Sequence, residues 1–272
     1  MIPKVIHYCW FGNNPLPNSV KESIATWEKE CPNYKIIEWN ESNFDVKCNQ
    51  YVREAYDNKR WAFVSDYARL LALVNYGGIY LDTDVKVLKK LDPLLEYKGF
   101  CGFEDNERLG TATLGCEPGF WVFKEWLNSY ANRRFILEDG EMDEEPNVCS
   151  LTRICKSRGL VTNGQVQNIN DFQVFSSDYF SPKSYVTGET HITQNSFTIH
   201  QFNESWRNDR EKMMHQRKIK LIQKYGLGKG IAIADVLNMP SMLINNINKS
   251  GLKRGLSNTV THVFKKIFGK IF

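Results

Sequence analysis

Apolar residues alternate with polar ones along the first two hundred positions in two periods, one typical of strands and one of helices. β-branched and aromatic runs at 4–10 and 35–39 predict two strands. Between them, apolar residues at helical spacing predict a helix over 19–30. Two strands joined by a helix form a βαβ unit, so the chain is expected to begin a parallel sheet.

The clearest predicted helix covers 63–76, where apolar side chains occupy one stripe of its surface. Gly77-Gly78 follows and supplies a left-handed helix cap. Residues 79–81 then read as a short buried strand. This strand leads directly into Asp82-Thr83-Asp84.

The rest of the chain continues to alternate, without an internal repeat or a low-complexity segment. Strands are predicted at 85–88, 100–104, 111–114 and 197–200, and helices at 50–59, 120–130 and 147–158. We therefore predict one α/β domain over 1–206, with a mixed, Rossmann-like sheet flanked by helices. Residues 207–272 are predicted to form a basic helical C-terminal extension.

Composition supports an ordinary globular protein, because 42% of the 272 residues are hydrophobic and 24% are charged. The seven cysteines contain no C-x-x-C pair, which argues against a zinc ribbon or a disulfide framework and favours reduced thiols. The N-terminus lacks the layout of a signal peptide, and we expect no apolar stretch of about 18 residues. The expected location is cytoplasmic, peripheral on the inner face of the cell membrane.

Charge is distributed unevenly around the net value of +4. Residues 207–272 hold fourteen Lys/Arg and three Asp/Glu, a net charge of +11, whereas 1–206 hold 21 basic and 28 acidic residues, a net charge of −7. In 252–272, apolar residues recur every three or four positions among the lysines. That pattern predicts an interfacial helix on an anionic membrane, with packing on the body or a free tail as the alternative. The single apolar face argues against nucleic-acid binding.

Asp82 and Asp84 place two carboxylates close together at a strand end, where they repel one another unless a cation lies between them. Oxygen ligands suit Mg²⁺ or Mn²⁺, which keep coordination positions open for phosphate. An isolated D-x-D triplet is common by chance in solvated turns. The helix, glycine cap and strand that precede it favour a site, because ligands of open α/β sheets bind at the carboxyl ends of strands.

Three further groups of residues are candidates for the same site. Asp66 and Arg69 share one helix face at i and i+3, where an arginine is suited to phosphate or to a carboxylate. The strand end from His7 to Trp10 carries aromatic rings that suit a nucleobase, and His200 is a candidate third metal ligand. Each also has a structural interpretation, namely a surface ion pair, core packing and a lone structural histidine.

Three separated segments, IPKVIHYCWFG at 2–12, SDYAR at 65–69 and YGGIYLDTD at 76–84, resemble glycosyltransferase family 32 in order and spacing. That family includes bacterial capsule and polysaccharide transferases and fungal mannosyltransferases, and the sugar-transferring domains of large clostridial toxins resemble it distantly. His200 and Ser205-Trp206 are similar to its closing motif. The resemblance covers about residues 1–206.

The resemblance implies a GT-A fold and retaining transfer of a hexose from a nucleoside-diphosphate sugar, expected to be UDP-linked. It implies a glycan or lipid-linked acceptor in cell-surface polysaccharide synthesis. It also implies that Trp10 stacks on the base, that Asp66 and Arg69 contact the donor, and that a loop with Ser205 and Trp206 closes over the β-phosphate.

The predicted site can be stated residue by residue. The catalytic set is Asp66, Arg69, Asp82 and Asp84; the donor-binding set is His7, Trp10, Asp66, Arg69, Asp82, Thr83, Ser205 and Trp206; the metal set is Asp82, Asp84 and His200; the candidate acceptor carboxylates are Glu104, Asp105 and Glu117. Two rival functions use the same features. One is a metal-dependent nucleotidyl or phosphoryl transferase, and the other is a non-enzymatic protein that binds a membrane surface.

Overall fold

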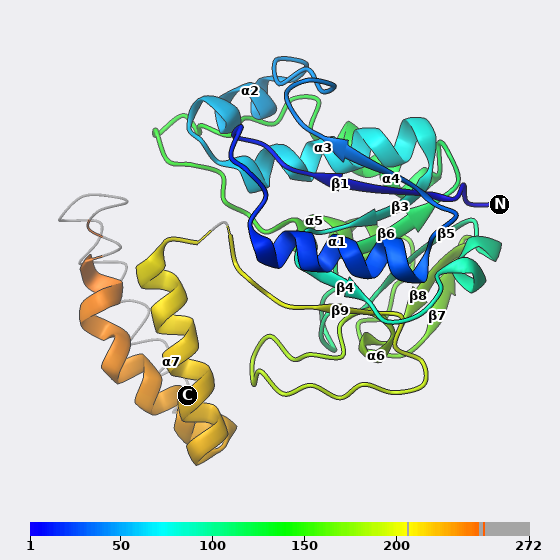
Figure 1. Ribbon diagram of the computed structural model, residues 1–272. Coiled ribbons are helices and arrows are strands. Elements are labelled where there is room, and N and C mark those ends of the chain that lie inside the picture. The colour runs from blue at the N-terminus through cyan, green and yellow to red at the C-terminus, as the bar shows by residue number, and fades with distance from the viewer. Residues whose placement is uncertain (206, 245–246, 248–272) are drawn as a thin grey trace. The chain divides into compact units, whose positions relative to one another are not determined.

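The computed structural model describes residues 1–205, 207–244 and 247, and it divides into two compact units (Figure 1). Unit 1 consists of Met1–Leu137, Met142–Ser184 and Glu189–Asn203. Unit 2 consists of Glu138–Glu141, Tyr185–Gly188 and the chain from Glu204 onward. The sequence-based domain boundary at 206 stays a prediction.

Unit 1 is built on a seven-stranded mixed sheet with the order β2-β1-β3-β6-β5-β8-β7. The strands are β1 (Val5–Cys9), β2 (Lys35–Trp39), β3 (Gly78–Leu81), β5 (Gly99–Gly102), β6 (Thr113–Cys116), β7 (Gln167–Ile169) and β8 (Phe172–Phe175). β1 pairs in parallel with β2 and β3, whereas β6 runs antiparallel to β3 and β5. The predicted mixed α/β sheet and its opening βαβ unit are therefore confirmed.

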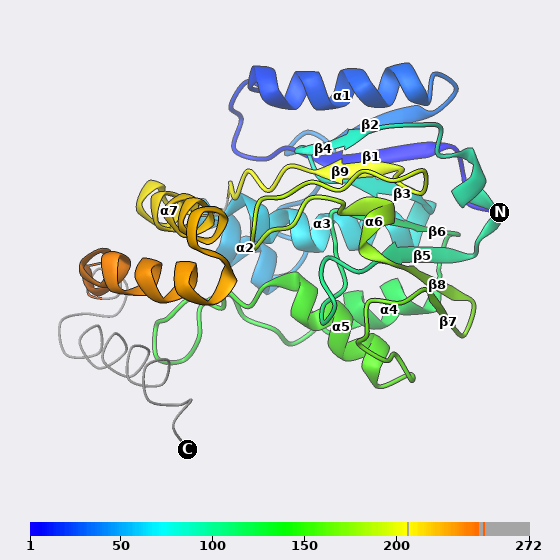
Figure 2. The ribbon, with the colours of Figure 1, turned by 90° about the horizontal axis from the view of Figure 1, so that it is seen from below.

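Helices cover both faces of this sheet (Figure 2). The helices of unit 1 are α1 (Asn18–Glu30), α2 (Gln50–Asp57), α3 (Trp61–Tyr76), α4 (Trp121–Asn128), α5 (Asn147–Lys156) and α6 (Ser177–Phe180). Side chains that alternate along each strand feed two hydrophobic cores. In β3, Tyr80 enters the core with α3 and α4, whereas Ile79 and Leu81 enter the core with Trp27 of α1.

A second, two-stranded sheet follows the D-x-D turn. β4 (Val85–Val87) pairs antiparallel with β9 (Thr198–His200), and Val85 lies opposite His200. The 3-10 helix η1 (Asp92–Glu96) comes next in the chain after β4. This pairing joins the turn after β3 to a segment more than a hundred residues later in the chain.

The hairpin of β7 and β8 was not predicted, because its two strands are only three and four residues long. Asn170 and Asp171 join them with φ values of 49° and 67°. Two positive φ values at consecutive positions are typical of a two-residue hairpin turn of type I′. The Asn-Asp pair between two short apolar runs was the available signal.

Unit 2 contains α7 (Asp209–Tyr225) and a second helix, Leu227–Ile244. Asn208 and Glu211 form a capping box at the start of α7, and Gly226 with φ 79° separates the two helices. Leu227–Ile244 has the length and composition of a membrane-crossing helix, with a mean hydropathy of 1.2, which corrects the expectation that no such stretch exists. Soluble proteins also contain such helices, so this alone assigns no span. The predicted interfacial segment 252–272 lies outside the described residues.

Gly78 begins the strand that leads to the D-x-D turn, and we expect its replacement to be costly. Its φ is +101°, and a Cβ atom there would lie 2.7 Å from the carbonyl oxygen of Val5. Gly159 is the matched control: its φ is +100°, and a Cβ atom there would meet nothing within 4 Å. Its replacement therefore measures the cost of backbone strain without a steric clash. We expect Gly159→Ala to cost about 1–2 kcal/mol and Gly78→Ala to cost more, measured by urea unfolding. Equal losses in the two variants would refute the close packing of β1 against β3.

Candidate active site

The D-x-D turn lies where β3 ends, next to the end of the parallel strand β1. The amide of Asp82 donates to the carbonyl of Ala112 at 2.9 Å, and the amide of Val85 donates to the carbonyl of Asp82 at 3.0 Å. The backbone around both acids is therefore fixed on either side. In open α/β sheets this edge is where ligands bind.

Pairing of β4 with β9 brings His200 beside the two acids. Nε2 of His200 lies 3.2 Å from Oδ1 of Asp84, and the amide of Asn203 donates to Oδ2 of Asp84 at 2.8 Å. One ligand atom from each of Asp82, Asp84 and His200 lies within 4.8 Å of the other two. All three side chains are partly accessible to solvent.

These three residues fit a divalent cation. Carboxylate and imidazole are ligands that Mn²⁺ and related cations accept. Nδ1 of His200 is buried and has no hydrogen-bond partner among the described residues, which leaves a nitrogen lone pair or proton unsatisfied there. The predicted metal set is thus brought together in one place by the fold.

The charges in this group shift one another's protonation. Burial raises the pKa of Asp84, but His200 and the amide of Asn203 together bring it below its usual value. Burial lowers the pKa of His200, but Asp84, Asp82 and Glu104 together bring it above its usual value. Both shifts favour the charged forms, as expected for a close acid–imidazole pair, and binding of a cation by His200 would release the imidazole proton.

Arg69 is buried, with 4% of its surface exposed, and lies between two carboxylates. One Nη contacts Oδ1 of Asp66 at 3.0 Å and Oδ1 of Asp82 at 3.2 Å, and the other donates to the carbonyl of Thr111 at 3.0 Å. Its Nε donates to the carbonyl of Ser65, and the guanidinium lies 4.5 Å from the Tyr80 ring centre. Every guanidinium nitrogen is engaged, so in this structure Arg69 holds the aspartates and offers no open fork to phosphate.

Asp66 is as deeply buried as Arg69 and receives a second polar contact. The amide nitrogen of Asn147 donates to Oδ1 of Asp66 at 2.5 Å, and the hydroxyl of Thr111 donates to the amide oxygen of Asn147 at 2.8 Å. Burial raises the pKa of Asp66 to about 6, although Arg69 opposes that shift. The cost of desolvation therefore exceeds the benefit of the arginine.

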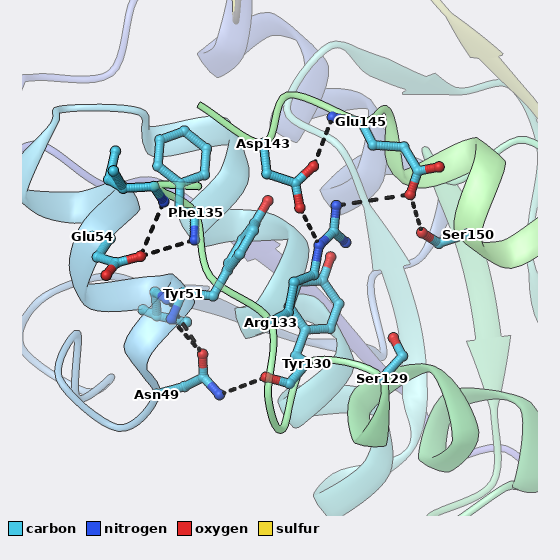
Figure 3. Close-up of polar contacts among 12 residues, drawn as sticks. Asn49, Tyr51, Glu54, Ser129, Tyr130, Arg133, Phe135, Asp143, Glu145 and Ser150 are labelled. Atoms are coloured by element: carbon cyan, nitrogen blue, oxygen red, sulfur yellow. Dashed lines mark hydrogen bonds and ion pairs between the residues drawn. The ribbon is translucent and has the colours of Figure 1, made fainter. Parts of the chain in front are cut away.

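Asn147 reaches Asp66 because the segment before α5 is held against α2 (Figure 3). Arg133 donates to Asp143 at 2.6 Å, and its guanidinium lies about 5 Å from the rings of Tyr51 and Tyr130. Glu54 of α2 accepts the backbone amides of residues 135 and 136. These contacts fix the loop that ends at α5, whose first residue is Asn147.

The two predicted donor-binding residues of the N-terminal motif differ in burial: His7 lies in the core, whereas Trp10 is partly accessible. His7 is fully buried, its Nε2 contacts the carbonyl of Gly77 at 2.8 Å, and its Nδ1 accepts from the indole of Trp39. Both ring nitrogens are occupied within the core, so His7 supports β1 and is not exposed to a donor. Trp10 lies one residue beyond β1, is partly accessible, and donates its indole N–H to the carbonyl of Asn14 at 2.7 Å.

Three residues of the predicted donor-binding set remain. Thr83 is partly accessible within the turn, and Ser205 is exposed in unit 2, whereas Trp206 lies outside the described residues. Their predicted contacts with a donor stay predictions.

The three candidate acceptor carboxylates differ in their distance along the fold from the D-x-D turn and in the partners that they bind. Burial raises the pKa of Glu104, and His200 and Asp82 are among the charges that act on it. Asp105 is bound by its neighbour Arg108 at 2.6 Å. Glu117 follows β6 at the end that pairs with the start of β3, and it binds the N-terminal amine. Glu117 therefore lies at the wrong edge of the sheet for the acceptor role, which leaves Glu104 as the carboxylate coupled to the site.

Sequence reasoning missed Asn147, Thr111 and Tyr80 as parts of this group. Tyr80 donates its hydroxyl to Oδ1 of Asp82 at 2.8 Å, and its place two residues before Asp82 was the available signal. Asn147 was recognised only as a helix start, and nothing local links it to Asp66, which lies 81 residues earlier.

Comparison with known proteins gives one matching family and several partial relatives. Residues 17–100 match the family described as the glycosyltransferase sugar-binding region containing a DXD motif. The chain is 32% identical to inositol phosphoceramide mannosyltransferase 3 of Schizosaccharomyces pombe, over 35% of this chain and 28% of that protein. It is 31% identical to a mannosyl phosphorylinositol ceramide synthase of Saccharomyces cerevisiae, over 47% of this chain and 35% of that protein. The chain thus spans about a third of the length of these curated relatives.

Among solved structures, the galactosyltransferase LgtC with donor and acceptor sugar analogues is similar to this chain at 14% identity and a TM-score of 0.39. That likeness covers 78% of this chain and 93% of LgtC.

Asp66 gives a test of the site's electrostatics that needs no ligand. A carboxyl whose folded pKa is raised from 3.8 to about 6 destabilises the fold as pH rises through that range. We expect Asp66→Asn to increase the free energy of unfolding at pH 7.5 by up to about 3 kcal/mol, with the gain vanishing near pH 4. Urea unfolding at both pH values measures this.

The matched control is Asp171→Asn, which removes an exposed carboxylate facing Lys98. We expect little change at either pH, because exposed pairs contribute little. A loss of stability in Asp66→Asn that is equal at both pH values would contradict the raised pKa of Asp66.

Proposed function

The chain belongs to the glycosyltransferase family whose sugar-binding region contains a DXD motif, and on that premise we propose that it transfers a hexose from a nucleoside-diphosphate sugar. The observation that carries this proposal is the convergence of Asp82, Asp84 and His200 at the carboxyl end of β3. The family resemblance drawn from the three sequence motifs is confirmed. We further propose that the transfer retains anomeric configuration and that the acceptor is a glycan or a lipid-linked oligosaccharide.

Asp82, Asp84 and His200 are the residues that would hold a divalent cation, Mn²⁺ or Mg²⁺. When bound, such a cation neutralises the negative charge that develops on a diphosphate leaving group. Asp66, Asp82, Asp84 and Glu104 outnumber the one buried arginine among the described residues of the group, so added positive charge is favourable there.

The protein's own residues orient the donor. The contacts of Asp66 with Asn147 and Arg69 both use Oδ1, which leaves Oδ2 to accept a hydroxyl of the donor sugar. Arg69 keeps Asp66 and Asp82 at a fixed separation, so both carboxylates are in place before the donor arrives.

Trp10 is proposed to stack on the base of the nucleotide. It lies just beyond β1, beside the D-x-D turn, and its ring remains partly accessible. Its indole N–H is already bound to Asn14, which fixes the orientation of the ring. We expect a uridine nucleotide, and guanosine-diphosphate mannose is the competing donor because the named fungal relatives are mannosyltransferases or mannosyl-lipid synthases.

Retention without an enzyme nucleophile is consistent with how the described carboxylates are engaged. Asp66 is held by Arg69 and Asn147, and Asp84 is held by His200 and Asn203. We propose that the bond from the anomeric carbon to the β-phosphate oxygen breaks as a bond to the acceptor oxygen forms on the same face. The proton of the acceptor hydroxyl passes to the departing phosphate oxygen.

Asp84 is the decisive residue for this function. We expect Asp84→Asn to lower donor turnover by at least about 100-fold, because it removes the carboxylate charge that faces His200 and the cation. Turnover is measured as free nucleoside diphosphate together with glycosylated acceptor, over a panel of uridine-diphosphate hexoses and guanosine-diphosphate mannose with and without Mn²⁺. Product NMR reports the anomeric configuration.

Asp171→Asn again serves as the control, and we expect its turnover to equal that of the unchanged protein. Full turnover in Asp84→Asn would contradict the metal assignment. Release of pyrophosphate in place of a nucleoside diphosphate would favour a nucleotidyl transferase.

Glu104 provides a second test, directed at the acceptor side. If no carboxylate of the protein takes the acceptor proton, Glu104→Gln keeps kcat within about tenfold and mainly raises KM for the acceptor. Steady-state kinetics with varied acceptor separates these two effects. A loss of kcat by about 1,000-fold or more would instead make Glu104 a base or a nucleophile.

A further inference from the structure

The two helices of unit 2 form a close antiparallel hairpin, visible as the yellow α7 and the orange helix after it (Figure 1). The side-chain amide of Asn238 donates to the carbonyl of Met214 at 3.0 Å, and Arg217 donates to the carbonyl of Leu237 at 2.9 Å. A Cβ atom on Gly230 would lie 2.4 Å from the Cα atom of Ile222. Gly230, Ala234 and Asn238, at intervals of four, therefore form the buried face of Leu227–Ile244.

The face of Leu227–Ile244 next to this buried one carries large apolar side chains in solvent. Ile233, Val236, Leu237 and Ile244 are 36–58% exposed and fall on one stripe at i, i+3, i+4 and i+11. We call these four residues the apolar stripe. Only 17% of this helix is buried. This arrangement is the reverse of an ordinary surface helix, which turns its large apolar side chains inward.

The hairpin is strongly basic. Residues 207–244 contain three acidic residues and the eight basic residues Arg207, Arg210, Lys212, Arg217, Lys218, Lys220, Lys224 and Lys229, which gives a net charge of +5. Lys229 lies one helical turn before Ile233, at the N-terminal end of the apolar stripe. Like charges disfavour a second copy of this hairpin as the partner, whereas an anionic surface is attracted to it.

We propose that this hairpin docks the protein on an anionic lipid bilayer, with the apolar stripe of Leu227–Ile244 inserted at the level of the headgroups. The apolar side chains of the hairpin suit the boundary of the acyl chains, and its lysines suit the lipid phosphates. The long stem of Lys229 allows its ammonium group to reach the phosphates while its neighbours insert. The residues of this surface belong to unit 2, whereas Asp82, Asp84 and His200 belong to unit 1.

The hairpin contacts indicate that Leu227–Ile244 lies on the membrane and does not cross it. The helix carries Lys229 and Asp235, and its Asn238 and Leu237 are bound to α7. Eight of the seventeen residues of α7 are charged. Insertion of the helix would either break these contacts or draw α7 into the hydrocarbon, where charged side chains are costly.

The test uses the full chain and co-sedimentation with vesicles of phosphatidylglycerol and phosphatidylcholine. We expect Val236→Asp combined with Leu237→Asp to lower the vesicle partition coefficient at least about tenfold, because both side chains leave the interface. The matched control is Val161→Asp, since Val161 of unit 1 is 59% exposed and Val236 is 58% exposed. Binding of the control should be unchanged.

A second pair of variants changes charge alone. Lys220→Glu with Lys224→Glu alters two exposed residues near the tip of the hairpin. We expect weaker vesicle binding at low salt and a smaller difference at high salt, since salt screens the attraction. This pair keeps the proposal testable if the aspartate variant does not fold, which circular dichroism reports.

Unchanged binding by both pairs of variants would overturn the proposal and assign membrane binding to another segment, such as 252–272. Equal binding to vesicles of phosphatidylcholine alone would overturn the role of charge. Resistance of the bound protein to alkaline carbonate would show a spanning helix, and conversion of a dimer to a monomer by the aspartate pair would show a second copy as the partner. Sugar transfer to a soluble acceptor is measured in parallel, so its failure is a separate result.

Discussion

The guanidinium of Arg69 lies between the carboxylates of Asp66 and Asp82 and bonds to the backbone near Thr111. One side chain therefore connects α3, the end of β3 and the segment leading into β6. Because Arg69 is buried, its charge must be matched by the protein, and the two aspartates that match it are also acids that we propose contact the donor. Because Asp82 also contacts Arg69, the guanidinium keeps a carboxylate partner even when Asp66 is neutral. The geometry of the D-x-D turn is in this way tied to the packing of the central sheet.

Burial of Asp66 beside Arg69 lowers the stability of the fold, and that loss points to a functional role for the group. The pKa of Asp66 is raised to about 6 despite the neighbouring arginine, so its ionised form is held at the expense of stability. Asp84, Asp82 and Glu104 add further negative charge around His200. Arg69 contacts two of these carboxylates, and the others lie around His200, so acidic groups outnumber basic ones among the described residues of the site. A divalent cation would offset this excess of negative charge and would also bind the diphosphate of a nucleotide sugar, which is what the proposed sugar transfer requires.

Residues outside the candidate site hold its side chains in position. The loop before α5 is bound by Glu54 and by the Arg133–Asp143 pair, and it delivers Asn147 to Asp66 (Figure 3). His7 connects β1 to Gly77 and Trp39 from within the core. In unit 2, small residues between the helices leave the large apolar side chains outside, where a lipid surface suits them. Unit 1 thus holds the candidate sugar-transfer residues, and unit 2 holds the apolar stripe.

Local sequence determined most elements of unit 1, though not the hairpin of β7 and β8, because helix stripes, glycine caps and short apolar runs act over a few residues. It identified Asp82 and Asp84 through the capped helix and buried strand before them, and it placed Asp66 and Arg69 on one face of that helix. It could not show that Arg69 is fully engaged, that Glu117 lies at the other edge, or that His7 is enclosed, since these depend on strand order and direction. Asn147 and Asp66 are 81 residues apart, and only the tertiary structure brings them to 2.5 Å. Contacts of that kind depend on loop closure and packing across the chain, which no local pattern encodes.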